Sequence, residues 1–300
     1  MPHYIPFPHR TPDSQYTDLL YRVLRKGGRS PQTRQGVGAR TIIREGMDFE
    51  LRNGFPMIPD RDVSRFWNRP IGELCAFING VTTLEGLVEF GCTWWDPWVT
   101  KEKTALFGLQ PGDIGPASYG GAFHDFPTLD GQRFDQFDNL PKQIRQLPYD
   151  RVHFVTPWMP AENARGEGTN QKTTIAPCHG WVHVRIVGDD MHLHMFQRSG
   201  DTPVGVPSNM IQYAALALML EHLTGFTATH FHHTISDSHI YDNQVGNVLE
   251  LLTREPRCLP TVTLTDAGRQ ITDIHAFRRE HFEVTDYHPH PAINSIPVST

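Results

Sequence analysis

Apolar residues recur at two spacings along this chain, and together the spacings predict a mixture of helices and strands. Helical spacing begins where Asp13 and Ser14 can cap a leucine-rich run that ends near Gly27–Gly28. Expected helices cover residues 14–27, 70–80, 84–90, 134–146, 210–223 and 241–252. Expected strands cover residues 41–51, 152–156, 226–235, 261–264 and 282–286, with loops at 101–121 and 161–173.

The segment from Ala176 to Asp201 is predicted to form a hairpin, because two strand-like runs flank a Gly-Asp-Asp turn. Antiparallel pairing would bring the entry of the first strand close to the exit of the second. Cys178 and Arg198 are therefore expected on one wall of a site. The helix that follows, Met210–Leu223, is apolar nearly all round, which indicates that it is buried.

Length and composition favour one large α+β domain that spans residues 1–300. Hydrophobic residues make up 38% of the chain, enough for a sizeable core, and no repeat or linker divides the sequence. Residues 1–12 are rich in proline and histidine, so we expect an irregular N-terminal arm there.

Charge and cysteine content narrow the classes of partner. The formal charge of −6 argues against a stable nucleic-acid complex or a membrane-surface role, although a few arginines suffice to bind one phosphate. No apolar run is long enough to cross a bilayer, and Met1–Arg10 lacks the apolar segment of a signal peptide. The four cysteines form no C-x-x-C pair. We therefore expect a reduced, cytoplasmic protein.

Three polar residues are candidates for chemistry on their local setting alone. Cys178 would be a nucleophile only as a thiolate, which Arg198 could stabilise, yet a lone cysteine is more often structural. Glu73 lies on an otherwise apolar helix face, where it either satisfies a neighbour or acts as an acid–base group. Asn209 at a helix start is usually a cap, although its carboxamide could also pair with a planar heterocycle.

Aromatic and histidine clusters have simpler explanations. Three of the six tryptophans occur within Cys92–Trp98, which is either part of the core or the wall of a flat ligand site. The strand-like segments His192–His194 and His230–His233 place histidines on shared faces that could bind zinc. No carboxylate or cysteine completes a recognisable ligand set there, so we expect no metal.

An ordered set of motifs from about Asp18 to the C-terminus resembles the thymidylate synthase family. The motifs are E-L-C-A-F-I-N-G at Glu73–Gly80, T-W-W-D-P-W at Thr93–Trp98, Y-G-G-A-F at Tyr119–Phe123, A-P-C-H at Ala176–His179, Q-R-S-x-D at Gln197–Asp201, G-V-P-S-N-M-I-Q-Y-A at Gly205–Ala214, D-S-H-I-Y-D-N at Asp237–Asn243, R-E-P-R at Arg254–Arg257 and D-Y-H-P-H-P at Asp286–Pro291. One such motif would be weak support, but the whole set in a single order is specific.

The resemblance implies a thymidylate synthase-like fold, with a mixed β-sheet, flanking helices and a sheet-to-sheet homodimer. It also implies transfer of a one-carbon unit from 5,10-methylenetetrahydrofolate to carbon 5 of a pyrimidine nucleoside monophosphate. Cys178 would attack carbon 6 and so activate carbon 5, which is otherwise unreactive. Glu73 would handle protons through ordered water, and Asn209 would hold the ring amide.

Further roles follow from the resemblance, residue by residue. Tyr119 and Asp201 join Cys178, Glu73 and Asn209 as catalytic candidates. The substrate-binding candidates are Arg34, Arg151, Arg198, Gln197, Ser199, His179, His239 and Tyr241. The folate-binding candidates are Trp95, Trp98, Asp201 and Gly205. Arg151 would reach the phosphate in the partner subunit, and Pro297–Thr300 would close over the bound ligands.

The chain departs from the family pattern at positions that bear on the product. Val152 replaces the second of two arginines at the partner-subunit phosphate contact, and Ser208 replaces an aromatic residue that faces the folate. Reductive methylation of dUMP or UMP is the expected reaction. Two alternatives stay open: hydroxymethylation, in which water replaces the hydride, and a non-catalytic nucleotide- or RNA-binding role, which the joint presence of Cys178 and Glu73 disfavours.

Overall fold

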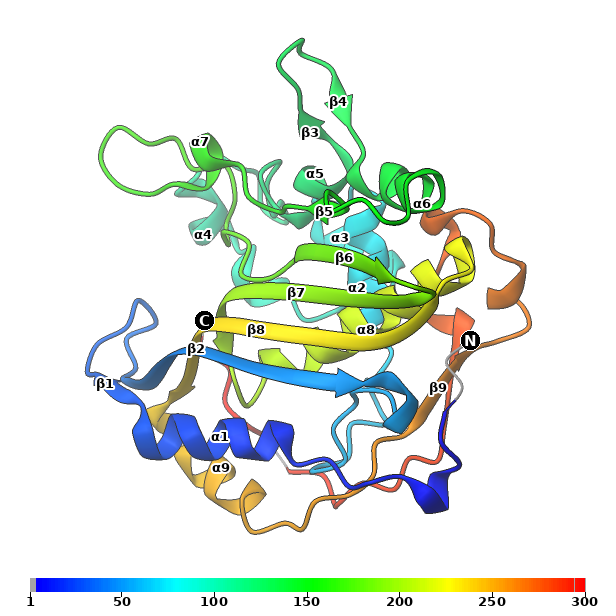
Figure 1. The fold of residues 1–300 in the computed structure, drawn as a ribbon. Coiled ribbons are helices and arrows are strands. Elements are labelled where there is room, and N and C mark those ends of the chain that lie inside the picture. The colour runs from blue at the N-terminus through cyan, green and yellow to red at the C-terminus, as the bar shows by residue number, and fades with distance from the viewer. Residues whose placement is uncertain (1–3, 294, 300) are drawn as a thin grey trace.

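The computed structural model describes residues 4–293 and 295–299, and a six-stranded sheet lies at its centre. The strands lie in the order β1-β2-β8-β7-β6-β5, antiparallel except for the parallel pair β7 and β8 (Figure 1). Their bounds are Gly28–Ser30 for β1, Ala39–Glu50 for β2, Phe154–Val155 for β5, Trp181–Val187 for β6, Asp190–Asp201 for β7 and Thr227–Tyr241 for β8. The expected α+β class with a mixed sheet is confirmed.

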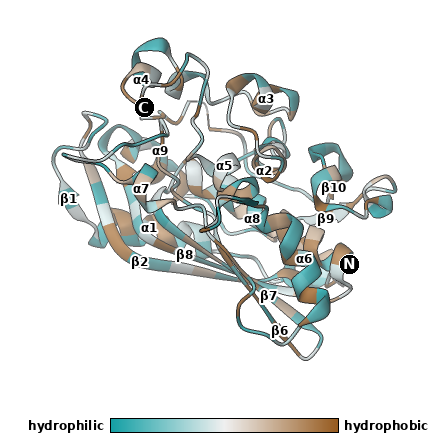
Figure 2. Cartoon of the chain, turned by 90° about the horizontal axis from the view of Figure 1, so that it is seen from above, coloured by the Kyte–Doolittle hydropathy of each residue, from teal (hydrophilic) through white to brown (hydrophobic). Residues whose placement is uncertain are grey.

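Helices flank this sheet, and two small antiparallel pairs complete the fold. The helices are α1 Gln15–Lys26, α2 Arg69–Ile78, α3 Leu84–Glu89, α4 Lys101–Ala105, α5 Tyr119–His124, α6 Gln136–Gln146, α7 Pro160–Asn163, α8 Gly205–Thr224 and α9 Val245–Leu251. The pairs are β3 Phe126–Pro127 with β4 Arg133–Phe134, and β9 Thr261–Leu264 with β10 Phe282–Thr285. Figures 1 and 2 show α2, α5 and α8 on one side of the sheet.

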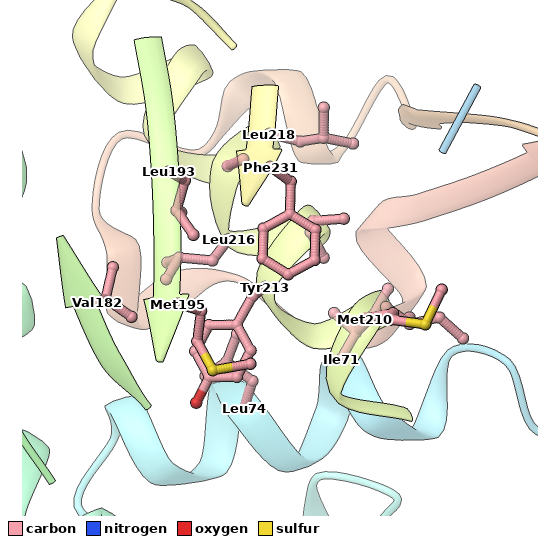
Figure 3. Close-up of a cluster of buried hydrophobic side chains, with 14 of the residues drawn as sticks. Ile71, Leu74, Val182, Leu193, Met195, Met210, Tyr213, Leu216, Leu218 and Phe231 are labelled. Atoms are coloured by element: carbon pink, nitrogen blue, oxygen red, sulfur yellow. The ribbon is translucent and has the colours of Figure 1, made fainter. Parts of the chain in front are cut away.

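Helix α8 is the centre of the core, as its sequence predicts. The sheet strands β7 and β8 contact one side of it, and α2 and α6 contact the other, so nearly every position is buried. Tyr213, Leu216 and Leu218 of this helix pack with apolar side chains of the sheet and of α2 (Figure 3). Each large apolar side chain buried in this way contributes about 1.5–3 kcal/mol. The helix ends at Gly225, whose φ of 84° closes the last turn in the left-handed region.

The region 101–121 was expected to be a loop, and this is wrong at both ends, where α4 and α5 form. The glycines of α5 are typical of a turn when only the sequence is considered. A Cβ on Gly121 would lie 1.9 Å from the Pro116 carbonyl oxygen, and one on Gly120 would lie 2.1 Å from that of Val81. These glycines therefore allow a helix to pack directly against backbone, with Tyr119 at its start.

Strand β8 is longer than expected, and the helix after it is correspondingly shorter. The sequence predicts strand to Ile235 and helix from Tyr241, whereas β8 continues to Tyr241 and α9 begins at Val245. Both edges of β8 pair with neighbouring strands as far as its last residues, which keeps the polar stretch Asp237–Ser238 extended. This extension carries His239 and Tyr241 to the end of the sheet.

The remaining expectations differ in detail. The strand at 152–156 shrinks to two residues, and α7 occupies the start of the loop 161–173. Phe134, the first residue of the helix expected at 134–146, lies in β4 instead, and α6 begins at Gln136. The N-terminal arm contains a short 3₁₀ helix, Phe7–His9, while Met1–His3 lie outside the described residues. Among the described helices, none has both the length and the apolar character needed to cross a membrane.

Candidate active site

A cavity of about 550 Å³ opens where the carboxyl ends of β7 and β8 meet the start of α8. Its wall contains every predicted site residue except Arg151, although these residues come from segments between positions 34 and 241. Arg151 is exposed near the other end of the sheet, with its backbone carbonyl 3.2 Å from His183 Nε2. The structure therefore brings together all of these candidates but one.

The predicted hairpin places Cys178 against Arg198. The backbone N–H of Arg198 donates to the Cys178 carbonyl at 2.8 Å, and Arg198 Nη2 lies 3.3 Å from Cys178 Sγ. The guanidinium also donates to the carbonyls of Ala176 and Pro177, both at 2.7 Å, which fixes its plane. Burial raises the pKa of the Cys178 thiol, and the nearby Arg198 charge opposes that rise. The pair thus has the arrangement that a thiolate nucleophile requires.

Glu73 is a buried carboxylate with a full set of donors. On α2 it is only 6% exposed, and Trp95 Nε1 and Trp94 Nε1 donate to Oε1, the latter at 2.7 Å. Gln212 Nε2 donates to Oε2 at 2.6 Å, and Cys92 Sγ lies 3.5 Å from Oε1. Burial raises the pKa of Glu73 while these four contacts oppose it. A buried carboxylate whose pKa is raised above its ordinary value is suited to acid–base chemistry.

A directed hydrogen-bond relay joins Glu73 to the amide of Asn209. Gln212 donates through Nε2 to Glu73 Oε2, so its Oε1 is left to accept from Asn209 Nδ2, at 2.8 Å. Asn209 Oδ1 then accepts from Gln197 Nε2 at 2.9 Å, and Gln197 Oε1 lies 2.8 Å from His233 Nε2. Burial lowers the pKa of His233 to about 3, so its ring is neutral and can donate there. The relay fixes which way round the Asn209 amide lies.

The far end of the cavity is polar and suited to hydroxyl groups. His239 and Tyr241 lie edge to face, with ring centroids 5.0 Å apart. Asp237 lies beneath them and accepts from the Thr41 hydroxyl and from Ser199 Oγ, the latter at 2.9 Å. Burial alone would raise the pKa of Asp237, but bonds from His239, Thr41 and Ser199 outweigh it and bring the pKa to about 2. Asp237 is thus a charged group that supports the Ser199 and His239 side chains.

Aromatic side chains form a second wall. The tryptophans are part of the core and also line the cavity, since Trp95 is 7% exposed and Trp98 lies 6.1 Å from it between ring centroids. Tyr119 stacks on His179 at 4.5 Å, and its hydroxyl accepts from the Cys178 backbone N–H at 2.7 Å. Burial lowers the pKa of His179 to about 3, which keeps this ring neutral. The wall suits a flat, apolar heterocycle.

Asp201 is a second, half-buried acid in the cavity wall, and it connects the cavity to the C-terminal segment. Burial raises its pKa, and a bond of 2.9 Å from Gln244 Nε2 opposes the rise. The same nitrogen lies 2.9 Å from the Pro297 carbonyl oxygen. The C-terminal segment expected to cover the ligands is thereby held beside this acid, while Thr300 lies outside the described residues.

Sequence reasoning missed several residues that complete the site. Gln212 is one helical turn after Asn209 within an apolar helix, and a buried amide at that spacing is a usable signal. Gln244 had no such signal, because Asp201 and Pro297, the partners that tie it to the site, are distant in sequence. Lys103 and Arg165 also line the cavity and add positive charge near Arg34. The cavity therefore combines a thiol beside an arginine, one buried and one half-buried acid, an oriented amide and a cationic rim.

Comparison with known families agrees with this arrangement. Residues 14–299 match the family model described as thymidylate synthase, which leaves almost none of the 300-residue chain unmatched. Members of this family transfer one carbon to a pyrimidine nucleotide, and they generally take it from methylenetetrahydrofolate. The motif order, the mixed sheet and the matched range lead to one conclusion: the chain belongs to the thymidylate synthase family and is a one-carbon transferase.

Proposed function

We propose that this enzyme catalyses reductive methylation of a uridine monophosphate at carbon 5, with dUMP as the simplest substrate. The observation that carries the proposal is the relay from His233 to Glu73, which orients the Asn209 amide beside Cys178. Uracil offers an N–H donor and a carbonyl acceptor side by side, and a carboxamide offers the complementary pair. Cytosine would reverse part of this pattern and leave buried polar groups unpaired.

The geometry supports a covalent first step. Cys178 Sγ would add to carbon 6 of the ring as a thiolate stabilised by Arg198, and the electron pair would move to carbon 5. Carbon 5 would then bond to the one-carbon unit and lose its proton to a water held by Glu73, while the bond from that unit to the folate nitrogen would break with its electron pair left on the nitrogen. Expulsion of the sulfur restores the thiolate. When bound, the folate supplies the methylene carbon and the hydride that completes the methyl group.

The polar groups assign the remaining contacts. Arg198 and Arg34 would bind the phosphate, while His239 and Tyr241 would hold the sugar hydroxyl. Trp95 and Trp98 would cover one face of the folate, and Asp201, beside Gly205, would accept from its pterin N–H groups. The fit is supported by the aromatic wall and by the Asp201 carboxylate, which lines the cavity and accepts a bond from Gln244 at 2.9 Å.

Hydroxymethylation is the second candidate, and one observation favours it. Ser208 is half-buried at the start of α8, where the family has an aromatic residue against the folate, so less apolar surface excludes water. Incubation with methylenetetrahydrofolate and each of dUMP, UMP, dCMP and CMP, followed by product mass, separates the candidates. A methyl product with dihydrofolate supports methylation. A hydroxymethyl product with tetrahydrofolate would refute it, and turnover of the cytidine nucleotides alone would refute the role given to Asn209.

We also propose a homodimer in which Arg151 reaches the phosphate of the partner. The sheet face opposite α8 carries a hollow of about 480 Å³ lined by His183, Arg185 and His192, and Arg151 lies beside it. Mixing Cys178→Ala chains with Arg151→Ala chains tests this sharply. A mixed dimer regains one intact site only if Arg151 acts across the interface; an arginine that serves its own chain leaves both sites defective.

The same proposal places the enzyme in the cytoplasm. All four cysteines are free, and the mechanism needs Cys178 as a thiol rather than a disulfide. Activity that survives only under reducing conditions is the expected outcome.

A further inference from the structure

A cluster of ligand-type side chains lies outside the cavity, where α5 and α6 meet the C-terminal part of the chain. His124 ends α5, Asp135 caps the start of α6, and His275 lies in the 3₁₀ helix Ile274–Ala276. Nε2 of His275 is 2.8 Å and Nε2 of His124 is 3.4 Å from the same oxygen, Asp135 Oδ2. The three ligand atoms all lie within 4.8 Å of one another.

Each imidazole is held at its other nitrogen by a second carboxylate. His275 Nδ1 lies 2.9 Å from Asp273 Oδ1, and His124 Nδ1 lies 3.2 Å from Asp125 Oδ1. Without an ion, His275 Nε2 is within hydrogen-bond distance of Asp135 Oδ2; a metal that displaced the Nε2 proton would leave the other proton on Nδ1, where the second carboxylate accepts it. Histidines that bind metals commonly have such a partner, which also fixes the ring orientation. Both Nε2 atoms are therefore oriented toward one point beside Asp135.

Backbone contacts fix the carboxylates in turn. Asp135 Oδ1 accepts from the Asp138 N–H at 2.8 Å as the cap of α6, which leaves Oδ2 to bind an ion. Asp273 Oδ1 accepts from the His275 N–H at 2.9 Å. Ligands of a tetrahedral zinc ion, with bonds of about 2.0–2.2 Å, lie about 3.3 Å apart. The observed separations of 2.8 and 3.4 Å from Asp135 Oδ2 bracket that value.

We propose that His124, Asp135 and His275 bind a zinc ion, with water as the fourth ligand. Two imidazoles and one carboxylate are borderline donors that suit Zn²⁺ better than Mg²⁺ or Ca²⁺. The carboxylates of Asp125, Asp135 and Asp273 surround the proposed ion position. The nearby Lys142 is paired with Asp138 at 2.7 Å. The ion would join segments 140 residues apart, and it stabilises the folded state because it binds that state preferentially.

The test uses the full chain after treatment with a chelator, with Zn²⁺ as the probe. Calorimetric titration should give one equivalent bound in the micromolar range or tighter, together with a rise in Tm. His275→Ala should abolish this binding. Asp273→Asn, which removes only the supporting charge, should weaken it about 10- to 100-fold.

Two controls separate this site from other histidines and from misfolding. His192→Ala alters the stacked histidines of the open sheet face and should leave zinc affinity unchanged. Asp135→Asn retains a side chain that can cap α6 and should lose binding with a near-normal apo Tm. The proposal is overturned if the wild type binds no zinc in the micromolar range, or if His192→Ala removes the binding while His275→Ala retains it.

Discussion

Replacing Gln212 by methionine tests whether the buried relay controls proton handling. Gln212 is 0% exposed, and it joins Asn209 and Glu73 through bonds of 2.8 and 2.6 Å. Methionine has a similar length and lacks the amide, so both partners lose a bond. A hydrogen bond to a charged group contributes about 1.5–3 kcal/mol and a neutral one about 0.5–1.5 kcal/mol. The free energy of unfolding should therefore fall by about 2–4 kcal/mol.

The same substitution should change catalysis in a characteristic way. If only the bond to Glu73 matters in the transition state, kcat/KM for the preferred nucleotide falls about 10- to 150-fold. Burial raises the pKa of Glu73, with the Gln212 bond among the opposing contacts, so its loss raises that pKa further. Activity that needs the carboxylate is lost below its pKa, and the acid limb of the kcat/KM profile should move to higher pH.

Steady-state rates across pH, with dUMP as substrate and dCMP as competitor, provide the measurement. Met210→Leu is the matched control, because it repacks the same buried helix with little change in volume and no change in hydrogen bonding. It should leave the pH profile unchanged. A Gln212→Met enzyme that loses stability yet keeps the wild-type kcat/KM, acid limb and preference over dCMP would refute the reasoning.

Three further substitutions test other parts of the structure. Cys178→Ala should abolish product formation and retain nucleotide binding by calorimetry, and full activity would exclude covalent catalysis. Burial raises the pKa of Asp60 from 3.8 to about 6, so the folded state keeps a proton that the unfolded chain releases. The free energy of unfolding should therefore fall by up to about 3 kcal/mol as the pH rises from below 3.8 to above about 6. Urea unfolding across this pH range should show the fall for the wild type but not for Asp60→Asn. The same dependence of stability on pH in both proteins would contradict the prediction. Gly121→Ala brings a Cβ to 1.9 Å from the Pro116 carbonyl oxygen and should lower the free energy of unfolding by about 1–3 kcal/mol or more. Activity should also be lost, because Tyr119 lies on the same helix. A wild-type Tm would show that α5 can shift freely.

The parts of the fold that were predictable are those with strong local patterns. The hairpin around Cys178 and the apolar helix α8 follow from alternation, turn residues and periodicity. Helix α5 could not be foreseen, because its glycines are required by backbone contacts with distant segments. Strand β8 likewise extends through polar residues because two neighbours pair with it, which is a tertiary effect.

In the candidate site, too, some features follow from local sequence and others depend on tertiary contacts. Motif order assigned Cys178, Glu73 and Asn209, and the structure places them around one cavity. The partners that set their behaviour were not visible, since Gln212 meets Glu73 across 139 positions of sequence. Burial, which sets the pKa directions, is likewise a property of the assembled core. Sequence thus predicts which groups react, and only the fold shows the contacts that would tune them.

The bond between Gln244 and the Pro297 carbonyl has a consequence for the timing of turnover. Among the described residues, it is the one hydrogen bond that 295–299 make. A single neutral bond contributes about 0.5–1.5 kcal/mol, so thermal motion breaks it often. If these residues close over bound ligands, as the family resemblance implies, so weak a bond would let them open without a trigger, and contacts with the bound molecules would be needed to keep them closed.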